Sequence, residues 1–246
     1  MAIPIKIRIG LLYSVLHTLF FSTACAQSVP TRDTGYIRPP VTSSLQDLRR
    51  QLRNDPTKEL IELKQQIPDL VYDLRYATTR NFMHQSMYPE DTRVTFLRAP
   101  AATALRKVQD TLRQLGLGIK VFDAYRPYDV TVRFWDLVRD ARFVAHPAKG
   151  SGHNRGIAVD LTLIQRGSGA ELPMGTGFDD FSDTAHQDFT ALPEDVLQNR
   201  HLLRSTMERY GFIAYADEWW HYSWPEPSRF ELLDISFRKL KRIKAK

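Results

Sequence analysis

The segment "SGHNRGIAVD", residues 151–160, constrains the local fold strongly because it places His153 and Asp160 seven positions apart. Seven residues of extended strand span about 23 Å, whereas the ligands of one metal ion lie about 2 Å from it. The two side chains can meet at one ion only if the chain turns between them. Asn154 and Gly156 both tolerate turn geometry. A strand after this turn would direct Asp160 to one face and its aliphatic neighbours to the other.

This pair has two interpretations when it is taken alone. In the commoner one, His153 is an exposed loop residue and Asp160 is an unrelated structural acid. In the other, both side chains are ligands of one metal ion, because imidazole nitrogens and carboxylate oxygens are both zinc ligands.

A second stretch, "DEWWHYSWP", favours the metal interpretation, because it places Glu218 three residues before His221. A catalytic zinc ion usually has three protein ligands and one open position. His153, Asp160 and His221 would supply two imidazoles and one carboxylate, which leaves Glu218 to take a proton from water. The alternative is that Glu218 and His221 form a surface ion pair beside packed tryptophans.

The stretch "FDAYRPYDV" contributes a cation. Arg126 follows a predicted strand and precedes a proline, so its guanidinium can reach into a cleft at the end of that strand. An always-charged group there could stabilise an oxyanion. The alternative is a surface salt bridge from Arg126 to Asp123 or Asp129.

Helices and strands alternate loosely along the chain, which favours an α+β domain with a central mixed or antiparallel sheet flanked by helices. Hydrophobic spacing predicts strands over 70–78, 119–125, 156–164, 212–215 and 219–224. It predicts helices over 100–116, 128–140 and 194–211, and a short one near 44–53. Residues 165–190 are expected to form a long loop, and loops of that length are usually functional.

The N-terminal residues resemble a secretory signal peptide. Lys6 and Arg8 precede an apolar run that ends in small residues and an A-x-A site. We expect residues 1–26 to be removed after Ala26 and the protein to be periplasmic; lipidation at Cys25 is the alternative. Because Cys25 is the one cysteine, a chain cleaved there must build any zinc site from His, Asp and Glu.

The remaining chain is expected to comprise a polar arm over 27–58, a catalytic domain over 59–230 and a basic tail over 231–246. The formal charge of +6 falls to 32 basic against 28 acidic residues once residues 1–26 are removed. Six of those basic residues lie in "SFRKLKRIKAK" at the C-terminus, so a nucleic-acid surface is not expected across the domain. The tail is expected to be a solvated helical end, with contact to anionic lipid or wall polymer as the alternative. No later stretch has 18 consecutive apolar residues, so no transmembrane span is expected in the mature chain.

Together these stretches resemble a known family. "SGHNRGIAVD" fits the pattern S-x-H-x-x-G-x-A-x-D and "EWWH" fits E-x-W-H. Both patterns are typical of zinc peptidases that resemble the D-alanyl-D-alanine dipeptidases (VanX-like) and, more distantly, the D-alanyl-D-alanine carboxypeptidases. "YDLRYATTRNF", "DAYRP" and "MGTGFDDFSDTAH" are similar to the dipeptidase branch. The resemblance extends from about residue 60 to residue 225.

The resemblance implies a zinc site in a cleft and a role for each matching residue. His153, Asp160 and His221 would bind one Zn²⁺. Glu218 would act as general base and then as general acid, and Arg126 would polarise the scissile carbonyl. Asp179 would bind the substrate ammonium, while Ser151, Tyr76 and Asn81 would contact or shape the substrate pocket.

The implied substrate is D-alanyl-D-alanine, hydrolysed to two D-alanines in turnover or recycling of cell-wall peptides. An acylated N-terminus would leave Asp179 buried and unpaired, which is a physical reason to expect selection for free dipeptides. The alternative is a zinc carboxypeptidase or endopeptidase acting on peptidoglycan stem peptides, which would need an open cleft and no ammonium-binding acid. A non-catalytic zinc-bearing module that binds cell wall is a third interpretation, which the presence of Glu218 disfavours.

Overall fold

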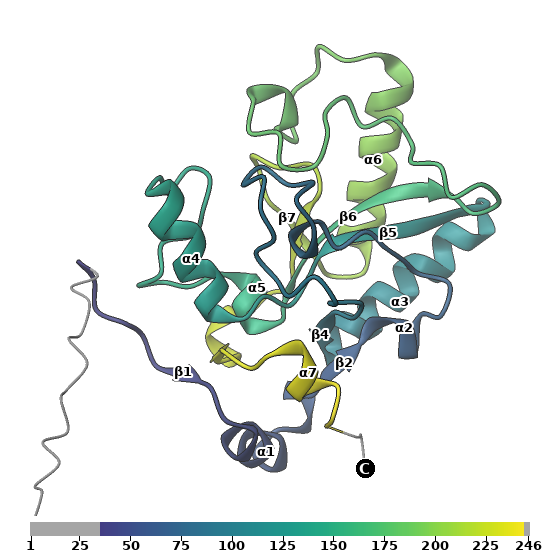
Figure 1. Ribbon diagram of the computed structural model, residues 1–246. Helices are drawn as coiled ribbons and strands as arrows, with labels where there is room; N and C mark the ends of the chain where they lie inside the picture. The colour runs from purple at the N-terminus through teal and green to yellow at the C-terminus, as the bar shows by residue number, and fades with distance from the viewer. Residues whose placement is uncertain (1–34, 244–246) are drawn as a thin grey trace, which may run out of the picture. The chain divides into compact units, whose positions relative to one another are not determined.

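A five-stranded sheet organises residues 35–243, the part of the chain that the computed structural model describes (Figure 1). The expected signal peptide and Cys25 lie outside the described residues. Within the described range, residues 36–243 belong to one compact unit. None of the helices within the described range is long and apolar enough to span a membrane.

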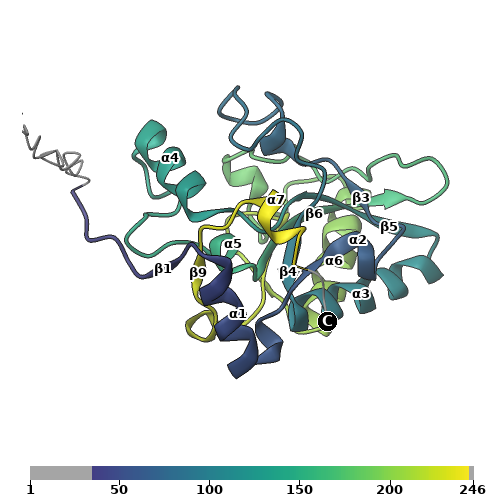
Figure 2. The same ribbon diagram turned by 60° about the horizontal axis from the view of Figure 1, so that its bottom comes forward.

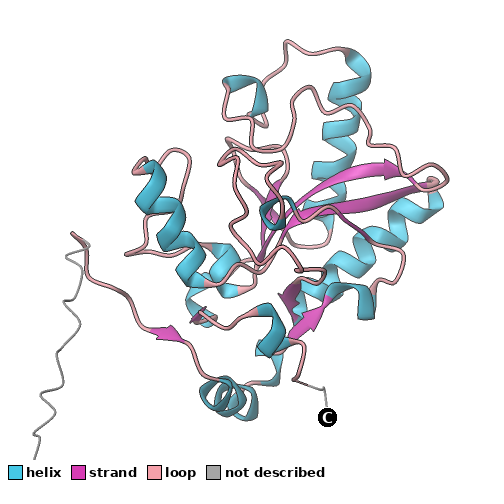
Figure 3. Ribbon diagram, in the orientation of Figure 1, coloured by secondary structure: helices cyan, strands magenta, loops and turns pink. Residues whose placement is uncertain are grey.

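Helices and strands alternate as the sequence predicts, with additional short elements (Figure 3). The strands are β1 Val41–Thr42, β2 Leu60–Glu62, β3 Val71–Tyr72, β4 Phe96–Arg98, β5 Leu117–Asp123, β6 Ala158–Gln165, β7 Ile213–Ala214, β8 His221–Ser223 and β9 Leu232–Leu233. The α-helices are α1 Leu45–Asn54, α2 Leu63–Gln66, α3 Ala99–Gln114, α4 Tyr128–Val138, α5 Gly152–Arg155, α6 Glu194–Arg209 and α7 Phe237–Leu240. Short 3₁₀ turns cover Pro56–Lys58, Arg75–Ala77, Asp183–Ala185 and Pro227–Arg229.

The main sheet is mixed, which confirms the predicted fold class. Its strand order is β3-β5-β6-β8-β7, and only β3 and β5 pair in parallel. Two further pairs lie outside it, β2 antiparallel to β4 and β1 parallel to β9. Figure 2 shows β1 beside β9, so a segment near the start of the described chain pairs with one near its end.

One face of the sheet packs against α3 and α6. Apolar residues at alternate positions of β6, including Val159 and Leu161, belong to this core. Leu105 and Val108 of α3, which are spaced to lie on one helix face, belong to the same core. Leu203 of α6 also belongs to it. The opposite face of β6 is therefore left for Asp160, as the alternation of residues in the sequence predicts.

A β-bulge in β5 changes which side chains face the site. Val121 pairs with Leu161, but Asp123 pairs with Asp160, so Phe122 is the extra residue. In a regular strand with Phe122 paired, Asp123 would share the face of Val121, which lies in the apolar core. The bulge turns Asp123 to the face of Asp160 instead. His221 of β8 pairs with Asp160 from the other side, so three neighbouring strands present polar groups on one face.

The predicted strand over 70–78 is wrong beyond Tyr72, because the chain enters a 3₁₀ turn at Arg75–Ala77. Asp73 stabilises this turn by accepting hydrogen bonds from Arg75 Nε at 2.7 Å and Arg80 Nη2 at 2.8 Å. The turn buries Tyr76 in a second, largely aromatic core. Alternation of apolar residues in this stretch therefore reflects burial in a turn rather than strand geometry.

Both ends of the described chain extend the packed structure beyond the predicted boundaries at 58 and 230. The predicted short helix is present as α1, and its Leu48 is buried. In the C-terminal segment, Leu233 and Ile235 are fully buried. The Tyr125 hydroxyl donates to the Ile235 carbonyl at 2.8 Å and accepts from the Ile235 amide at 3.0 Å. The C-terminal segment thus forms part of the second core.

We expect Leu233→Ala to lower the free energy of unfolding by about 2–5 kcal/mol, because it removes a fully buried side chain. Urea denaturation measures this effect. The matched control is Leu137→Ala, because Leu137 is 55% exposed, and a change within about 0.5 kcal/mol is expected there. Equal effects of the two substitutions would contradict the packing of the C-terminal segment.

Candidate active site

His153 is held by the short helix α5. Ser151 caps this helix: its hydroxyl accepts from the Asn154 amide at 3.3 Å, and the Asn154 side chain accepts from the Ser151 amide at 2.9 Å. Gly156 ends the helix with a left-handed φ of 70°, and a Cβ there would lie 2.7 Å from the Leu60 side chain. The turn predicted between His153 and Asp160 is thus one helical turn closed by a required glycine.

The tautomer of His153 follows from its surroundings. Its Nδ1 lies 2.7 Å from the carbonyl oxygen of Ala124. Because a carbonyl can only accept a hydrogen bond, Nδ1 carries the proton and Nε2 presents its lone pair. This arrangement is typical of metal-binding histidines, whose second nitrogen is held by a backbone carbonyl or a carboxylate.

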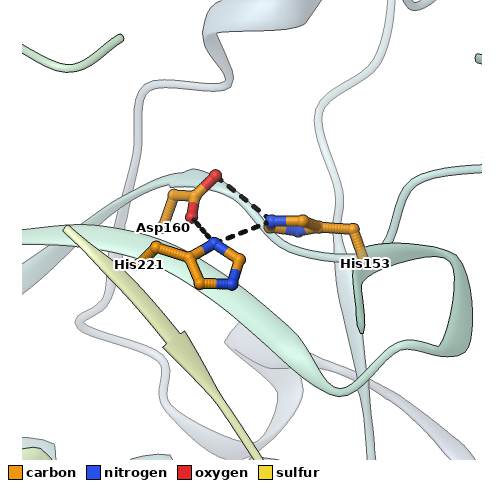
Figure 4. Close-up of side chains that lie close together, drawn as sticks. All are labelled: His153, Asp160 and His221. Atoms are coloured by element: carbon orange, nitrogen blue, oxygen red, sulfur yellow. Dashed lines mark hydrogen bonds and ion pairs between the residues drawn. The ribbon is translucent and has the colours of Figure 1, made fainter. Parts of the chain in front are cut away.

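His153, Asp160 and His221 converge from α5, β6 and β8 (Figure 4). His153 Nε2 lies 3.4 Å from Asp160 Oδ2 and 3.3 Å from His221 Nδ1. His221 Nδ1 lies 2.8 Å from Asp160 Oδ1. His153 and Asp160 of segment 151–160 therefore lie in contact, and His153 is a buried residue and not an exposed loop residue.

These distances fit a single zinc ion. Tetrahedral ligands about 2.0–2.1 Å from a zinc ion lie about 3.3 Å from one another. Two of the three separations match that value, at 3.3 and 3.4 Å, and the third is shorter, at 2.8 Å. Two imidazoles and one carboxylate also make a donor set that zinc accepts in catalytic sites.

Contacts among His153, Asp160 and His221 determine whether Asp160 is charged. Burial alone would raise the pKa of Asp160, but hydrogen bonds and charge from His153 and His221 hold that pKa well below its usual range. Asp160 is therefore ionised, as a metal ligand must be. His221 Nε2, on the far side of its ring from Asp160, lies 3.2 Å from Ser223 Oγ, which orients the imidazole.

Glu218 lies in the turn between β7 and β8, with its Oε2 3.7 Å from His221 Nδ1. Both side chains are only 18% exposed. Their contact is therefore largely buried, and is not the surface ion pair that the sequence left open as an alternative. Burial raises the pKa of the Glu218 carboxyl above its ordinary value, as suits a general base. The neighbouring Trp219 and Trp220 are buried core residues, as expected.

Arg126 makes the predicted salt bridge to Asp123, but the pair is buried rather than on the surface. Its Nη2 and Nε lie 2.8 and 3.1 Å from Asp123 Oδ2. The Tyr88 hydroxyl donates to the other oxygen of Asp123 at 2.6 Å. From the sequence, Asp123 is only an alternative ion-pair partner of Arg126, because no local pattern of residues predicts the bulge that turns Asp123 toward the site. Asp123 fixes the position of the guanidinium.

A cavity of about 240 Å³ lies over this group. It brings together the metal-binding group, Glu218, Arg126, Asp179, Tyr76 and Ser151, so eight of the nine predicted site residues line it. Aromatic side chains from three separate loops complete its wall, namely Phe82, Phe143 and Phe181. Phe181 packs against both of the others, with ring centroids 5.1 Å apart in each pair.

Asp179 presents an incompletely paired carboxylate. Its Oδ1 accepts a hydrogen bond from the Tyr76 hydroxyl at 2.9 Å. Its Oδ2 is buried and has no hydrogen-bond partner among the described residues. Burial raises the pKa of Asp179 well above its usual range. A cation that reached Oδ2 would restore the charged form, so the site is suited to an ammonium group.

Asn81 is the one predicted site residue that does not line the cavity. Its amide nitrogen donates to the carbonyls of Arg75, Thr78 and Gln85, and its side-chain oxygen accepts from the Met83 amide. The side chain is therefore committed to its own loop. Its contribution to the cavity is to hold that loop, from which Phe82 reaches the wall.

Sequence comparison shows the family of this chain. The family model described as D-Ala-D-Ala dipeptidase matches residues 56–239. The D-alanyl-D-alanine dipeptidase of Escherichia coli is 34% identical over 181 residues, covering 74% of this chain and 92% of that protein. The enzyme of the same name from Streptomyces coelicolor is 34% identical over 177 residues, covering 63% and 86%. A solved structure of the D,D-pentapeptidase VanY in complex with Zn(II) has a TM-score of 0.37 at 18% identity, covering 56% of this chain and 77% of that one. The chain belongs to the D-Ala-D-Ala dipeptidase family of zinc metallopeptidases.

Proposed function

We propose that this protein hydrolyses D-alanyl-D-alanine to two D-alanines with one bound Zn²⁺. Relatives named D-alanyl-D-alanine dipeptidase support the substrate class. The observation that carries the proposal is the buried, unpaired Oδ2 of Asp179 in the same cavity as the metal-binding group. A free dipeptide supplies the ammonium that this oxygen lacks, and an N-acylated peptide does not.

The size of the cavity supports a small substrate. Its 240 Å³ is below the range of about 300–1,000 Å³ that is typical of sites for drug-sized ligands. A carboxypeptidase or endopeptidase that acts on stem peptides would need room for a longer chain beyond the scissile bond. The aromatic wall and the unpaired acid both favour the dipeptide.

The residues divide the work of the reaction between them. A bound zinc ion supplies a Lewis acid for the carbonyl and for water. Glu218 takes the proton from the attacking water and passes it to the leaving amine. The Arg126 guanidinium, fixed by Asp123, stabilises the negative charge that develops on the carbonyl oxygen. Asp179, fixed by Tyr76, holds the substrate ammonium, and Ser151 contributes a hydroxyl at the wall.

The proposal extends to the location of the protein. The basic, apolar and small-residue sequence of residues 1–26 supports export to the periplasm, with lipidation at Cys25 as the alternative. An exported dipeptidase meets cell-wall fragments, so a role in peptide turnover or recycling follows. Contact of the basic tail with anionic lipid or wall polymer stays an untested alternative.

Purified protein is expected to bind about one zinc per chain, and His221→Ala to lose most of it, because one of three ligands is removed. Metal analysis after exhaustive dialysis measures this. His201→Ala is the matched control, since His201 is exposed on α6 and should keep full zinc content. Full occupancy in His221→Ala would remove His221 from the ligand set.

Glu218→Gln is expected to keep zinc while losing roughly 10²- to 10⁴-fold in kcat, because the amide cannot accept the proton. Turnover of D-alanyl-D-alanine and zinc content are measured on the same sample. Glu208→Gln, which changes an exposed carboxylate paired with Arg204 on α6, controls for loss of charge. A zinc-loaded Glu218→Gln variant with near-normal kcat would show that Glu218 is not the base.

Asp179→Asn is expected to lower kcat/KM for the free dipeptide by about 10- to 150-fold, the equivalent of one charge-assisted hydrogen bond of about 1.5–3 kcal/mol. The N-acetylated dipeptide should lose much less. The ratio of the two rates is the measured quantity, since it cancels general damage to folding or zinc loading.

Asp180→Asn is the matched control for this test. Asp180 lies on the same loop and accepts from the Ser182 amide, but does not line the cavity. In Asp180→Asn, the ratio of kcat/KM for the free dipeptide to that for the N-acetylated dipeptide should stay near the value of the unmodified protein. If Asp179→Asn lowered kcat/KM for the free and the N-acetylated dipeptide by the same factor, ammonium binding by Asp179 would be refuted. Efficient hydrolysis of acylated peptides by the unmodified protein would favour the carboxypeptidase alternative.

A further inference from the structure

The segment 174–186 carries Asp179 to the cavity, and its two ends lie beside one buried arginine of α6. Arg200 Nε donates to the Met174 carbonyl at 2.7 Å, at the start of the segment. Its Nη2 donates to the Thr184 carbonyl at 2.8 Å and its Nη1 to the His186 carbonyl at 3.1 Å, at the end. One guanidinium therefore joins both ends of the segment.

Arg200 is committed to these carbonyls. The residue is 5% exposed, and none of the ion pairs found within residues 35–243 involves it. Burial of a cation costs free energy unless its N–H groups are hydrogen-bonded, and the hydrogen bonds to the three carbonyls offset that cost. Each carbonyl is bonded to a different nitrogen of the planar guanidinium, whereas the three donors of a lysine ammonium all lie on one nitrogen and cannot reproduce this spread.

The backbone of the segment is shaped to approach this side chain. Gly175 has a left-handed φ of 84°, and a Cβ there would lie 3.3 Å from Arg200 Nη2 and 2.8 Å from the Leu192 side chain. Trp219 adds a second connection, since its indole donates to Thr176 Oγ1 at 2.8 Å and its amide donates to the Ala185 carbonyl at 3.0 Å. The ends of the segment are thus held from two sides.

The middle of the segment is held by packing. The ring of Phe178 stacks on Phe122 with centroids 4.8 Å apart and contacts Trp220 edge-on at 5.6 Å. Asp179 follows directly, in a left-handed conformation with φ of 63°, which few residues other than glycine adopt, although aspartate tolerates it better than most. The packing of Phe178 and the hydrogen bond from Tyr76 help to hold this conformation, and with it the direction of the carboxylate.

We propose that Arg200 is a positioning residue for substrate recognition: by joining the ends of segment 174–186 it fixes Asp179 where the substrate ammonium binds. This rests on the proposed function for the role of Asp179, but the anchoring of the segment does not. Arg200 does not line the cavity, so its effect on the substrate passes through the segment.

The test compares Arg200→Lys and Arg200→Met with Arg204→Met in the zinc-loaded full chain. Arg204 lies one turn further along α6, is 45% exposed and pairs with Glu208, so it controls for loss of an arginine from this helix. Two quantities are measured: hydrogen exchange of the backbone amides of 175–186 and of β6, and kcat/KM for free and N-acetylated D-alanyl-D-alanine.

Arg200→Lys is expected to speed amide exchange in 175–186 by roughly tenfold while β6 and zinc content stay unchanged. For the free dipeptide, kcat/KM should fall roughly 10- to 100-fold, as expected when a binding group is displaced, and the N-acetylated dipeptide should lose less. Arg204→Met should change neither quantity. Arg200→Met should show the same pattern, and Arg200→Lys provides the test if Arg200→Met does not fold.

Unchanged exchange and unchanged kinetics in Arg200→Lys would overturn the proposal. Equal acceleration of exchange in β6 and in the segment would also overturn it, because Arg200 would then support the whole fold. If the unmodified protein lacks dipeptidase activity but Arg200→Lys still loosens only 175–186, the anchoring stands and the proposed function fails.

Discussion

The pairing register of β5, β6 and β8 is the constraint on which the site depends. It places Asp160 opposite both Asp123 and His221, and α5 then brings His153 to the same face. Because side chains alternate along a strand, a slip of one residue in β6 would direct Asp160 into the apolar core. The aliphatic residues of β6 that pack on α3 and α6 oppose such a slip. The packing of the core and the geometry of the metal-binding group are therefore specified by the same alternation.

The buried charges around the cavity are paired with one exception. Asp160 is shared by two imidazoles, and Asp123 is paired with Arg126. Removing charges from water is costly, and these contacts offset that cost. Asp179 lacks such compensation at Oδ2. Among the described residues around the cavity, Asp123 and Asp160 are thus paired, and Asp179 keeps one oxygen without a hydrogen-bond partner, as the proposed binding of a substrate ammonium requires.

Sequence patterns predicted the features that depend on local spacing. The turn before Asp160, α3 and α6 follow from residue types at fixed intervals, whereas the convergence of the distant His221 with Asp160 was predicted from the zinc donor set and the family motifs. The features that were missed depend on contacts between distant segments. Alternation over 70–78 does not reveal that Tyr76 is buried by a turn, and the interpretation of 231–246 as a basic tail gave its charged residues more weight than its apolar ones, so it missed that Leu233 is in the core. Asn81 fits a family motif, yet its hydrogen bonds are all within its own loop.

The two halves of the site rest on different kinds of structure. The metal-binding group comes from strands and from α5, whose positions are fixed by backbone ladders and by the core. Asp179 comes from a long loop, whose position depends on hydrogen bonds from Arg200 and Trp219 and on the packing of Phe178. A loop held by few contacts can change without disturbing the sheet beneath it. The loop that carries Asp179 can therefore vary while the metal-binding group keeps its geometry, because the register that aligns Asp160 with His221 does not involve the loop.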